Sequence, residues 1–453
     1  MIGSAKIKGV KETSTNYASP YRPPPIALFN RMGRVAEKLG MAADLSVARM
    51  VAAAKKKSGL QDFGDEWFLQ PLSVLVDAIN KEAELTPFGK LVQKGRLESA
   101  LVTRLRVQEL LKQHPEIRDV NIEKIILIAG LQRTGTTTLH RLIAADPKVR
   151  SLMSWEALNP VPLPNEVPGN PKKRIQQAKI AERGLAYLSP EFFAIHPVEF
   201  DAPEEDVLLL DLCFMSQAPE ATMHVPGYAA WLERQDHTPA YEYLRTLLKI
   251  LTWQQPARNW VLKTPHHMEY LDIILKVFPE ATIVQTHRDP QKTMGSFCSM
   301  VAHGRGVFSD QVDAKEVAQH WVRKVRRLME RSIEVRASAP EKHFIDVSYY
   351  DLLKDPLAAV QRIYELAGIE FNEATAQAIA NTQQRNVQHR YGKHVYHLAD
   401  FDLSHDEIEN QFGFYRQRYQ IPFESEQNQQ NKNKISAKKT MAPGVNHEAE
   451  RQI

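Results

Sequence analysis

A glycine- and threonine-rich turn between an apolar run and an amphipathic segment is the feature best suited to chemistry. The turn reads Gly130-Leu131-Gln132-Arg133-Thr134-Gly135-Thr136-Thr137-Thr138. Its glycines let the backbone turn tightly, so that successive N–H groups converge on one point. The following helix adds the positive end of its dipole, and the threonine hydroxyls add donors. These groups together predict a cradle for phosphate oxygens.

The two glycines have the spacing of a nucleoside-triphosphate loop, but the lysine of that loop is missing. Thr136 stands where the Walker pattern has Lys, and the cation is Arg133, inside the loop. Without that lysine and an evident acidic magnesium ligand, triphosphate hydrolysis loses its usual support. Such a loop suits one phosphate with a transferring group at its edge. The alternative interpretation is a tight strand-to-helix turn without a ligand.

A second basic site follows another strand-like run. Arg288 ends the segment that begins at Thr282, and Asp289-Pro290 should stop the strand and begin a new element. Ser296 follows Arg288 by eight residues, which is about two helical turns. A guanidinium with a hydroxyl nearby can bind a second phosphate. Taken alone, the arginine could equally form a surface salt bridge.

The elements that would position these residues are predicted by hydrophobic periodicity. Short apolar, mostly β-branched runs predict strands at 125–129, 260–262, 281–285 and 343–347. Amphipathic segments separate them, among them 268–278 and 317–336. Strands that alternate with helices predict an α/β fold, a P-loop-like doubly wound parallel sheet flanked by helices.

The chain divides by composition into four parts. Residues 1–25 are polar and proline-rich, which predicts a flexible arm. Residues 26–120 carry helical periodicity and predict a helical N-terminal section. The α/β domain is expected over 121–423, and the polar residues 424–453 predict a disordered tail.

Bulk composition restricts the class of protein. Of 453 residues, 58 are Lys or Arg and 54 Asp or Glu, so the formal charge of +4 gives no argument for nucleic-acid or membrane-surface binding. Two cysteines, Cys213 and Cys298, cannot form a disulfide framework or a four-thiolate metal site. No signal peptide or long apolar run is evident, so a cytoplasmic protein is expected. Nothing in the sequence indicates an oligomeric state.

The two basic sites together resemble those of the sulfotransferase superfamily, in particular its bacterial and tyrosylprotein-type branches. The likeness runs from about Leu60 to Tyr419 and includes a Lys-x-Pro motif that begins at Lys263. It implies 3′-phosphoadenosine-5′-phosphosulfate (PAPS) as co-substrate, with no metal. The residues that it assigns to the 5′-phosphosulfate are Arg133, Thr134, Gly135, Thr136 and Thr137, and those that it assigns to the 3′-phosphate are Arg288 and Ser296.

A weaker part of the resemblance lies downstream. Gly392-Lys393-His394 and Tyr396 resemble a closing loop in which a basic residue reaches back to the 3′-phosphate. Lys393 or Arg390 is the candidate for that role.

The resemblance also implies the catalytic groups. Negative charge builds on the bridging oxygen that leaves, so Arg133 and Lys263 are the expected electrostatic stabilisers. Two residues compete as the base for the acceptor proton. Glu156 stands where the tyrosylprotein branch has its catalytic Glu, beside Trp155, whose ring could desolvate the carboxylate. His266 is the rival, because an imidazole titrates near neutrality.

A further cluster lies between these motifs. The aromatic run at Phe192-Phe193, with His196, suggests one wall of an acceptor pocket. The acidic run Glu204-Glu205-Asp206 follows Pro203 and predicts the N-terminus of a helix, where acids are stabilising.

The function predicted from these features is transfer of a sulfuryl group from PAPS to a hydroxyl or amine by in-line displacement. The resemblance allows a small-molecule, glycan or peptide acceptor. Two alternatives remain: a P-loop NTPase or small-molecule kinase, which would bind ATP with magnesium, and a non-catalytic nucleotide-binding protein.

Overall fold

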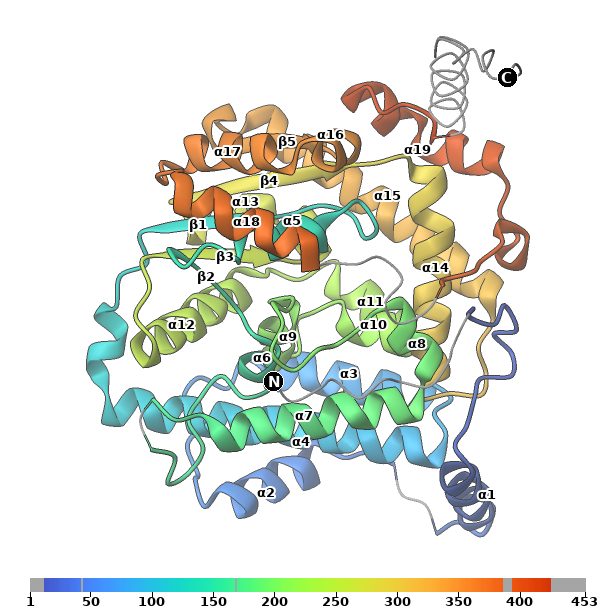
Figure 1. The fold of residues 1–453 in the computed structure, drawn as a ribbon. Helices are drawn as coiled ribbons and strands as arrows, with labels where there is room; N and C mark the ends of the chain where they lie inside the picture. The colour runs from blue at the N-terminus through green and yellow to red at the C-terminus, as the bar shows by residue number, and fades with distance from the viewer. Residues whose placement is uncertain (1–11, 42–43, 168, 386–392, 425–453) are drawn as a thin grey trace, which may run out of the picture.

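A five-stranded parallel sheet organises the chain in the computed structural model, which describes residues 12–41, 44–167, 169–385 and 393–424 (Figure 1). Its strands are β1 (Lys124–Ile128), β2 (Val149–Ser151), β3 (Asn259–Lys263), β4 (Ala281–His287) and β5 (Phe344–Ser348). Their order is β2-β3-β1-β4-β5, and every pairing is parallel. The predicted doubly wound α/β fold is confirmed.

The register brings the carboxyl ends of the three central strands to one edge. Ile128 in β1 lies opposite Lys263 in β3 and opposite Val284 in β4. Within the sheet, β3 and β2 lie on one side of β1, and β4 and β5 lie on the other side. Ligands of open α/β sheets bind at such a reversal, beyond the carboxyl ends of the strands.

Helices cover both faces of the sheet, because alternate residues of each buried strand point to opposite sides. Ile126 and Ile128 join the apolar cluster of α5, α17 and α18, whereas Ile125 and Leu127 join the larger cluster of α12, α13 and α15. These helices are α5 (Thr136–Ile143), α12 (Thr238–Gln254), α13 (Leu271–Val277), α15 (Ala314–Ser338), α17 (Pro356–Ala367) and α18 (Glu373–Arg385).

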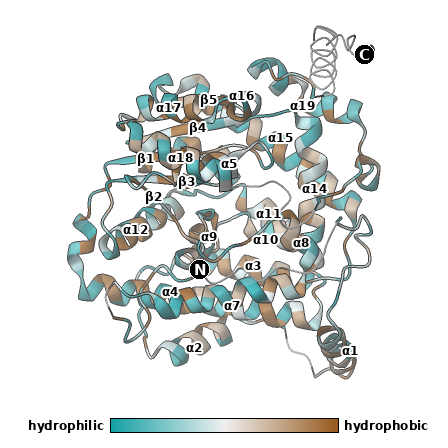
Figure 2. Cartoon of the chain, viewed as in Figure 1, coloured by the Kyte–Doolittle hydropathy of each residue, from teal (hydrophilic) through white to brown (hydrophobic). Residues whose placement is uncertain are grey.

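The N-terminal helices lie on the side of the molecule away from the sheet (Figure 1). They are α1 (Pro24–Lys38), α2 (Val47–Ser58), α3 (Leu69–Lys81) and α4 (Pro87–Gln113). Their apolar residues, among them Leu72 and Leu101, belong to the same cluster as Ile125 and Leu127 of β1. Figure 2 shows both hydrophilic and hydrophobic residues along α4 and α7.

Further helices connect β2 to β3, and others follow β4 and β5. The remaining α-helices are α6 (Ser154–Leu158), α7 (Lys172–Leu188), α8 (Pro190–Ile195), α9 (Val207–Leu210), α10 (Ala218–Thr222), α11 (Pro226–Leu232), α14 (Pro290–Gly306), α16 (Tyr349–Lys354) and α19 (His405–Tyr419). The 3₁₀ turns are η1 (Pro115–Asp119), η2 (Asp211–Cys213), η3 (Pro265–Glu269), η4 (Glu341–His343) and η5 (Leu398–Phe401). Of the helices in the described ranges, none is long and apolar enough to cross a bilayer.

Two features differ from the sequence-based expectation. β2 was not predicted, because its three residues are too few to show a period. Residues 12–23, expected to be part of a flexible arm, lie against the body of the protein instead. Tyr17 is buried and donates its hydroxyl to Ser299 at 3.0 Å, while the Thr13 N–H donates to the carbonyl of Lys393 at 3.1 Å. The predicted tail lies outside the described residues except for Glu424.

A buried ion cluster fixes η3, the turn that follows β3, against α15. Lys324 of α15 is fully buried, and its ammonium lies 3.2 Å from Glu269, 3.0 Å from Glu233 and 3.6 Å from Glu220. Removing one partner of such a cluster would leave uncompensated buried charge. The cluster therefore anchors η3, and with it the carboxyl end of β3, to α15.

Candidate active site

The loop between β1 and α5 has a backbone that glycine makes possible. Gly135 has φ +90° and Arg133 has φ +67°, both in the left-handed region. A Cβ on Gly130 would lie 2.0 Å from the hydroxyl of Thr286, so β4 excludes any side chain there. The loop thus follows the tight course that the sequence predicts, directly before the N-terminus of α5.

Hydroxyl groups tie this loop to the neighbouring strand. The Thr134 side chain is buried, and its Oγ1 lies 2.6 Å from the Leu131 carbonyl and 2.6 Å from the Thr286 hydroxyl. Thr136 is also buried, whereas Thr137 is exposed at the first turn of α5. Thr134 therefore shapes the loop, whereas Thr137 is among the exposed threonines at the start of α5.

The structure brings the two predicted basic sites together. Arg133 donates from Nε to the Ser296 hydroxyl of α14 at 3.0 Å, and Arg288 donates from a terminal nitrogen to the Arg133 carbonyl at 2.9 Å. Desolvation and the nearby Arg288 guanidinium lower the pKa of Arg133. Asp289 caps α14 by accepting from the Gln291 N–H, as the Asp-Pro pair predicts.

Arg288 is engaged by a carboxylate from the end of the described chain. Glu424 accepts from Nε at 2.6 Å and from the second terminal nitrogen at 3.3 Å. The Glu424 N–H donates to Asp289 at 2.9 Å, and the Arg288 guanidinium lies 4.1 Å from the centroid of the Tyr349 ring. A two-point contact with an anion is the geometry in which arginine also binds phosphate.

Lys263, at the carboxyl end of β3, contacts the acidic run 204–206. Its ammonium lies 2.5 Å from Glu205 Oε1, and its backbone N–H donates to Asp206 Oδ1 at 2.9 Å. The run does precede the N-terminus of a helix, α9, as predicted, but the side chain of its N-cap residue Asp206 makes no capping hydrogen bond. The acids instead hold the lysine.

A buried chain of polar groups fixes Asp206. Its Oδ2 lies 2.8 Å from His267 Nε2, and His267 Nδ1 lies 2.9 Å from the Tyr241 hydroxyl. Burial alone would raise the pKa of Asp206, but the His267 contact outweighs it and holds the pKa below its usual value. The carboxylate is thus kept ionised where it accepts the Lys263 N–H.

His196 lies among the charged groups of this site. Burial lowers its pKa; Glu204 and Glu205 act to raise it, and Lys263 and Arg133 act to lower it. Its ring is tilted against that of Phe192 in α8, with 6.0 Å between the ring centroids. Sequence reasoning placed His196 in a pocket wall without a chemical role.

Glu156, a predicted base, is committed to local structure. Its Oε1 lies 2.5 Å from Arg150, and its Oε2 accepts the Met153 N–H at 3.1 Å in a capping box at the start of α6. The ring of Trp155 faces the guanidinium of Arg174 at 4.9 Å. The carboxylate is buried with both oxygens engaged, so it lacks a free oxygen for a substrate.

His266, the second predicted base, is buried in an aromatic cluster. Its ring lies 5.7 Å from the His237 ring and 4.8 Å from the Tyr270 ring, and neither ring nitrogen has a hydrogen-bond partner among the described residues. Burial lowers its pKa well below the usual value. Its ring neighbours are thus the residue before α12, Tyr241 within α12 and the residue after η3.

The predicted closing segment contributes other residues than its lysine. Lys393 is exposed and pairs with Glu12 at 3.2 Å, and Arg390 lies outside the described residues. His394 reaches the site instead: its Nδ1 lies 3.3 Å from the Ser296 hydroxyl, and burial lowers its pKa to about 3. Tyr396 packs against Gly295, the residue directly before Ser296.

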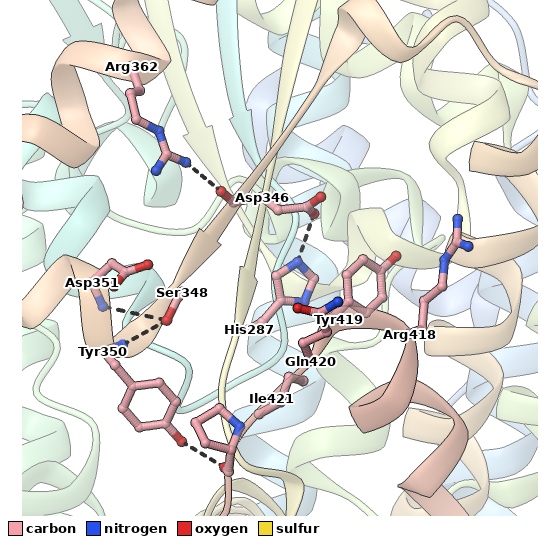
Figure 3. Close-up of a pocket in the computed structure, with 11 residues that line it drawn as sticks. His287, Asp346, Ser348, Tyr350, Asp351, Arg362, Arg418, Tyr419, Gln420 and Ile421 are labelled. Atoms are coloured by element: carbon pink, nitrogen blue, oxygen red, sulfur yellow. Dashed lines mark hydrogen bonds and ion pairs between the residues drawn. The ribbon is translucent and has the colours of Figure 1, made fainter. Parts of the chain in front are cut away.

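Two cavities lie near these elements. A polar cavity of about 370 Å³ is lined by His287, Asp346 and the segment that ends at Pro422, with Arg362 and Arg418 on opposite sides (Figure 3). A larger cavity of about 1020 Å³ lies between α4 and the start of the α6–α7 connection. Its apolar lining includes Val92, Ala100, Val102, Leu158, Leu163 and Leu208. Within the described ranges, no three His, Cys, Asp or Glu side chains cluster as metal ligands would.

Comparison with known proteins agrees with this geometry. The sequence profile of the Sulfotransferase family matches residues 126–373, more than half of the chain. A curated relative, omega-hydroxy-beta-dihydromenaquinone-9 sulfotransferase Stf3 of Mycobacterium tuberculosis, is 24% identical over 261 residues. That match covers 54% of this chain and 62% of the relative, so the chain spans less than two thirds of its length.

Two solved structures share the fold. Sulfotransferase STF1 from Mycobacterium tuberculosis H37Rv is 34% identical, with a TM-score of 0.71 over 82% of this chain and 98% of that one. Sulfotransferase STF9 from Mycobacterium avium is 26% identical, with a TM-score of 0.75 over 83% of this chain and 97% of that one.

The loop geometry predicts that Gly135→Ala destabilises the protein. A residue with a Cβ at φ +90° costs about 1–2 kcal/mol, and the new Cβ would also lie 3.0 Å from the Tyr349 ring. The free energy of unfolding in urea measures the loss. Gly184→Ala in α7 is the control, because its Cβ meets nothing within 4 Å, and it should be neutral or slightly stabilising. Equal effects of the two substitutions would contradict the assigned loop conformation.

Proposed function

The chain belongs to the sulfotransferase family, and on this premise we propose that it transfers a sulfuryl group from PAPS to a hydroxyl or amine. The observation that carries the proposal is the placement of three cations around one phosphate loop. Arg133 lies in the loop, Lys263 is the last residue of β3 on one side, and Arg288 directly follows β4 on the other. Because neighbouring strands are about 4.8 Å apart, one nucleotide with phosphates at both ends can span this edge.

The donor would be held at its two phosphorylated ends. The backbone N–H groups of the loop and the Thr137 hydroxyl would bind the 5′-phosphosulfate, with the N-terminus of α5 behind them. Arg288 and Ser296 would bind the 3′-phosphate. The carboxylate of Glu424 marks where anionic oxygens can sit on Arg288, and the 3′-phosphate would take its place.

The chemistry is an in-line displacement at sulfur. The acceptor oxygen forms a bond to sulfur as the bond from sulfur to the bridging oxygen breaks, and the electron pair remains on the phosphate. Arg133 and Lys263 would stabilise that charge, which is the main contribution that a preorganised site can make. We propose that this transfer needs no metal ion.

The kinase alternative has less support. Its loop would need a lysine where this chain has Thr136, and a carboxylate to hold magnesium beside the phosphates. Two carboxylates of this site, Glu205 and Glu424, are instead paired with Lys263 and Arg288.

The acceptor would be a small molecule with an apolar portion. The curated relative is named for a hydroxylated menaquinone derivative, an apolar molecule with a terminal hydroxyl. The cavity of about 1020 Å³ supports an acceptor of this class, because α6 and α9 line it and also adjoin the acidic run at Lys263. Its volume is at the upper end of the range for small-molecule sites.

Calorimetric titration with adenosine 3′,5′-bisphosphate tests the donor site. Binding should need no magnesium, and Arg288→Ala should weaken it about 10- to 100-fold, because two charge-assisted hydrogen bonds are lost. Arg331→Ala on the surface of α15 is the matched control and should change nothing. Binding of ATP with magnesium, and not of the bisphosphate, would replace this proposal by the kinase.

The contact of Glu424 with Arg288 predicts competition with the nucleotide. Glu424→Gln removes the charge that the 3′-phosphate must displace, so affinity for the bisphosphate should rise about three- to tenfold. The same titration measures the change. Glu370→Gln removes an exposed carboxylate that is likewise ion-paired, and should leave the affinity unaltered. An unchanged or lower affinity in Glu424→Gln would show that the nucleotide does not compete with this carboxylate.

A further inference from the structure

One carboxylate in the site has a free oxygen beside the catalytic cation. Glu205 Oε1 contacts the Lys263 ammonium at 2.5 Å, while its Oε2 has no hydrogen-bond partner among the described residues. Its side chain is 22% exposed, whereas that of Lys263 is 4% exposed. A substrate can therefore reach the carboxylate from its exposed side.

The neighbours of Glu205 hold it in that position. Glu204 Oε1 accepts the Glu205 N–H at 2.8 Å, and Glu204 Oε2 accepts the Ser154 hydroxyl at 3.2 Å. On the other side, Asp206 is fixed by the Lys263 N–H and by His267. Both flanking acids are thus committed to structure, and the acid between them is left for chemistry.

We infer that Glu205 is the general base that takes the proton from the acceptor during sulfuryl transfer. This inference rests on the proposed function and assigns a role that neither Glu156 nor His266 is placed to fill. Glu156 has both oxygens bound to Arg150 and Met153. His266 is buried within a ring cluster with His237 and Tyr270, where its ring nitrogens have no hydrogen-bond partner among the described residues.

The step balances without a further reactant. The acceptor O–H proton passes to Glu205 Oε2 as the acceptor oxygen bonds to sulfur. The bond between sulfur and the bridging oxygen breaks, and its electron pair stays on the departing bisphosphate, next to Lys263 and Arg133. The protonated carboxyl then returns its proton to solvent through its exposed side.

The geometry also explains why base and cation share one contact. The Lys263 ammonium has three N–H groups, so it can keep Glu205 while it donates to the bridging oxygen. The attacking and leaving oxygens lie in line on opposite sides of sulfur, and one lysine–glutamate pair can therefore address both ends of the reaction. His196, the residue that follows α8, also lies close enough to interact electrostatically with Glu204 and Glu205.

Transfer of ³⁵S from labelled PAPS to a panel of aliphatic alcohols and phenols of graded acidity tests the inference. Glu205→Gln keeps an oxygen for Lys263 but cannot take a proton, so kcat for an aliphatic alcohol should fall about 10²- to 10⁴-fold. The fall should shrink for nitrophenols, which ionise without help. Affinity for adenosine 3′,5′-bisphosphate, measured by calorimetry, should stay within about threefold of the wild type.

Matched variants separate a base from a structural residue. Glu204→Gln and His196→Gln should lower kcat less than about tenfold, with the same factor for every acceptor. A uniform loss across acceptors in Glu205→Gln would overturn the inference, because it would indicate a positioning role. A graded loss in His196→Gln would assign the base to the imidazole instead. If the wild type transfers label to no acceptor and does not bind the bisphosphate, the proposed function fails, and the inference with it.

Discussion

The mutual repulsion of cations at one edge of a parallel sheet is the constraint on which this structure depends. Arg133, Lys263 and Arg288 converge there because β1, β3 and β4 are neighbours in register and all end at the same edge. Like charges held close together in a partly desolvated site destabilise the fold unless opposite charge is supplied. How each cation is compensated indicates what the edge is built to bind.

The three cations are compensated in different ways. Lys263 is paired with Glu205 and held by Asp206 at its backbone. Arg288 is paired with Glu424, which comes from the last described residues of the chain. Arg133 has no carboxylate partner among the described residues and donates to the Ser296 hydroxyl. The site therefore retains positive potential at Arg133, which favours an anionic ligand. Lys263 and Arg288, on either side of it, are each paired with a carboxylate that a ligand can displace or contact.

The local features of the site could be predicted from the sequence, and its long-range contacts could not. The loop at Gly130 carries its own evidence, because glycines, threonines and an arginine stand between a strand-like and a helix-like segment. By contrast, Lys263 and Glu205 are 58 residues apart, and Arg288 and Glu424 are 136 apart. No periodicity relates such positions, since the packing of the connecting helices decides which side chains meet.

Glu156 shows the limit of local reasoning most clearly. A Glu three residues into a short helix can serve a capping box or a substrate, and the residue types are the same in both cases. The deciding fact is the Arg150 guanidinium, which β2 brings to its side. β2 has only three residues and could not be predicted from its pattern, so the commitment of Glu156 could not be predicted either.

The loop from Gly130 to Thr137 is expected to bind the 5′-phosphate end of the nucleotide through its backbone. Hydrogen–deuterium exchange of the backbone N–H groups in this loop, with and without adenosine 3′,5′-bisphosphate, tests it most directly. The account predicts that saturating bisphosphate slows exchange in the loop and in the first turn of α5. Unchanged exchange in the loop, when calorimetry shows the ligand bound, would place the nucleotide elsewhere and contradict the account.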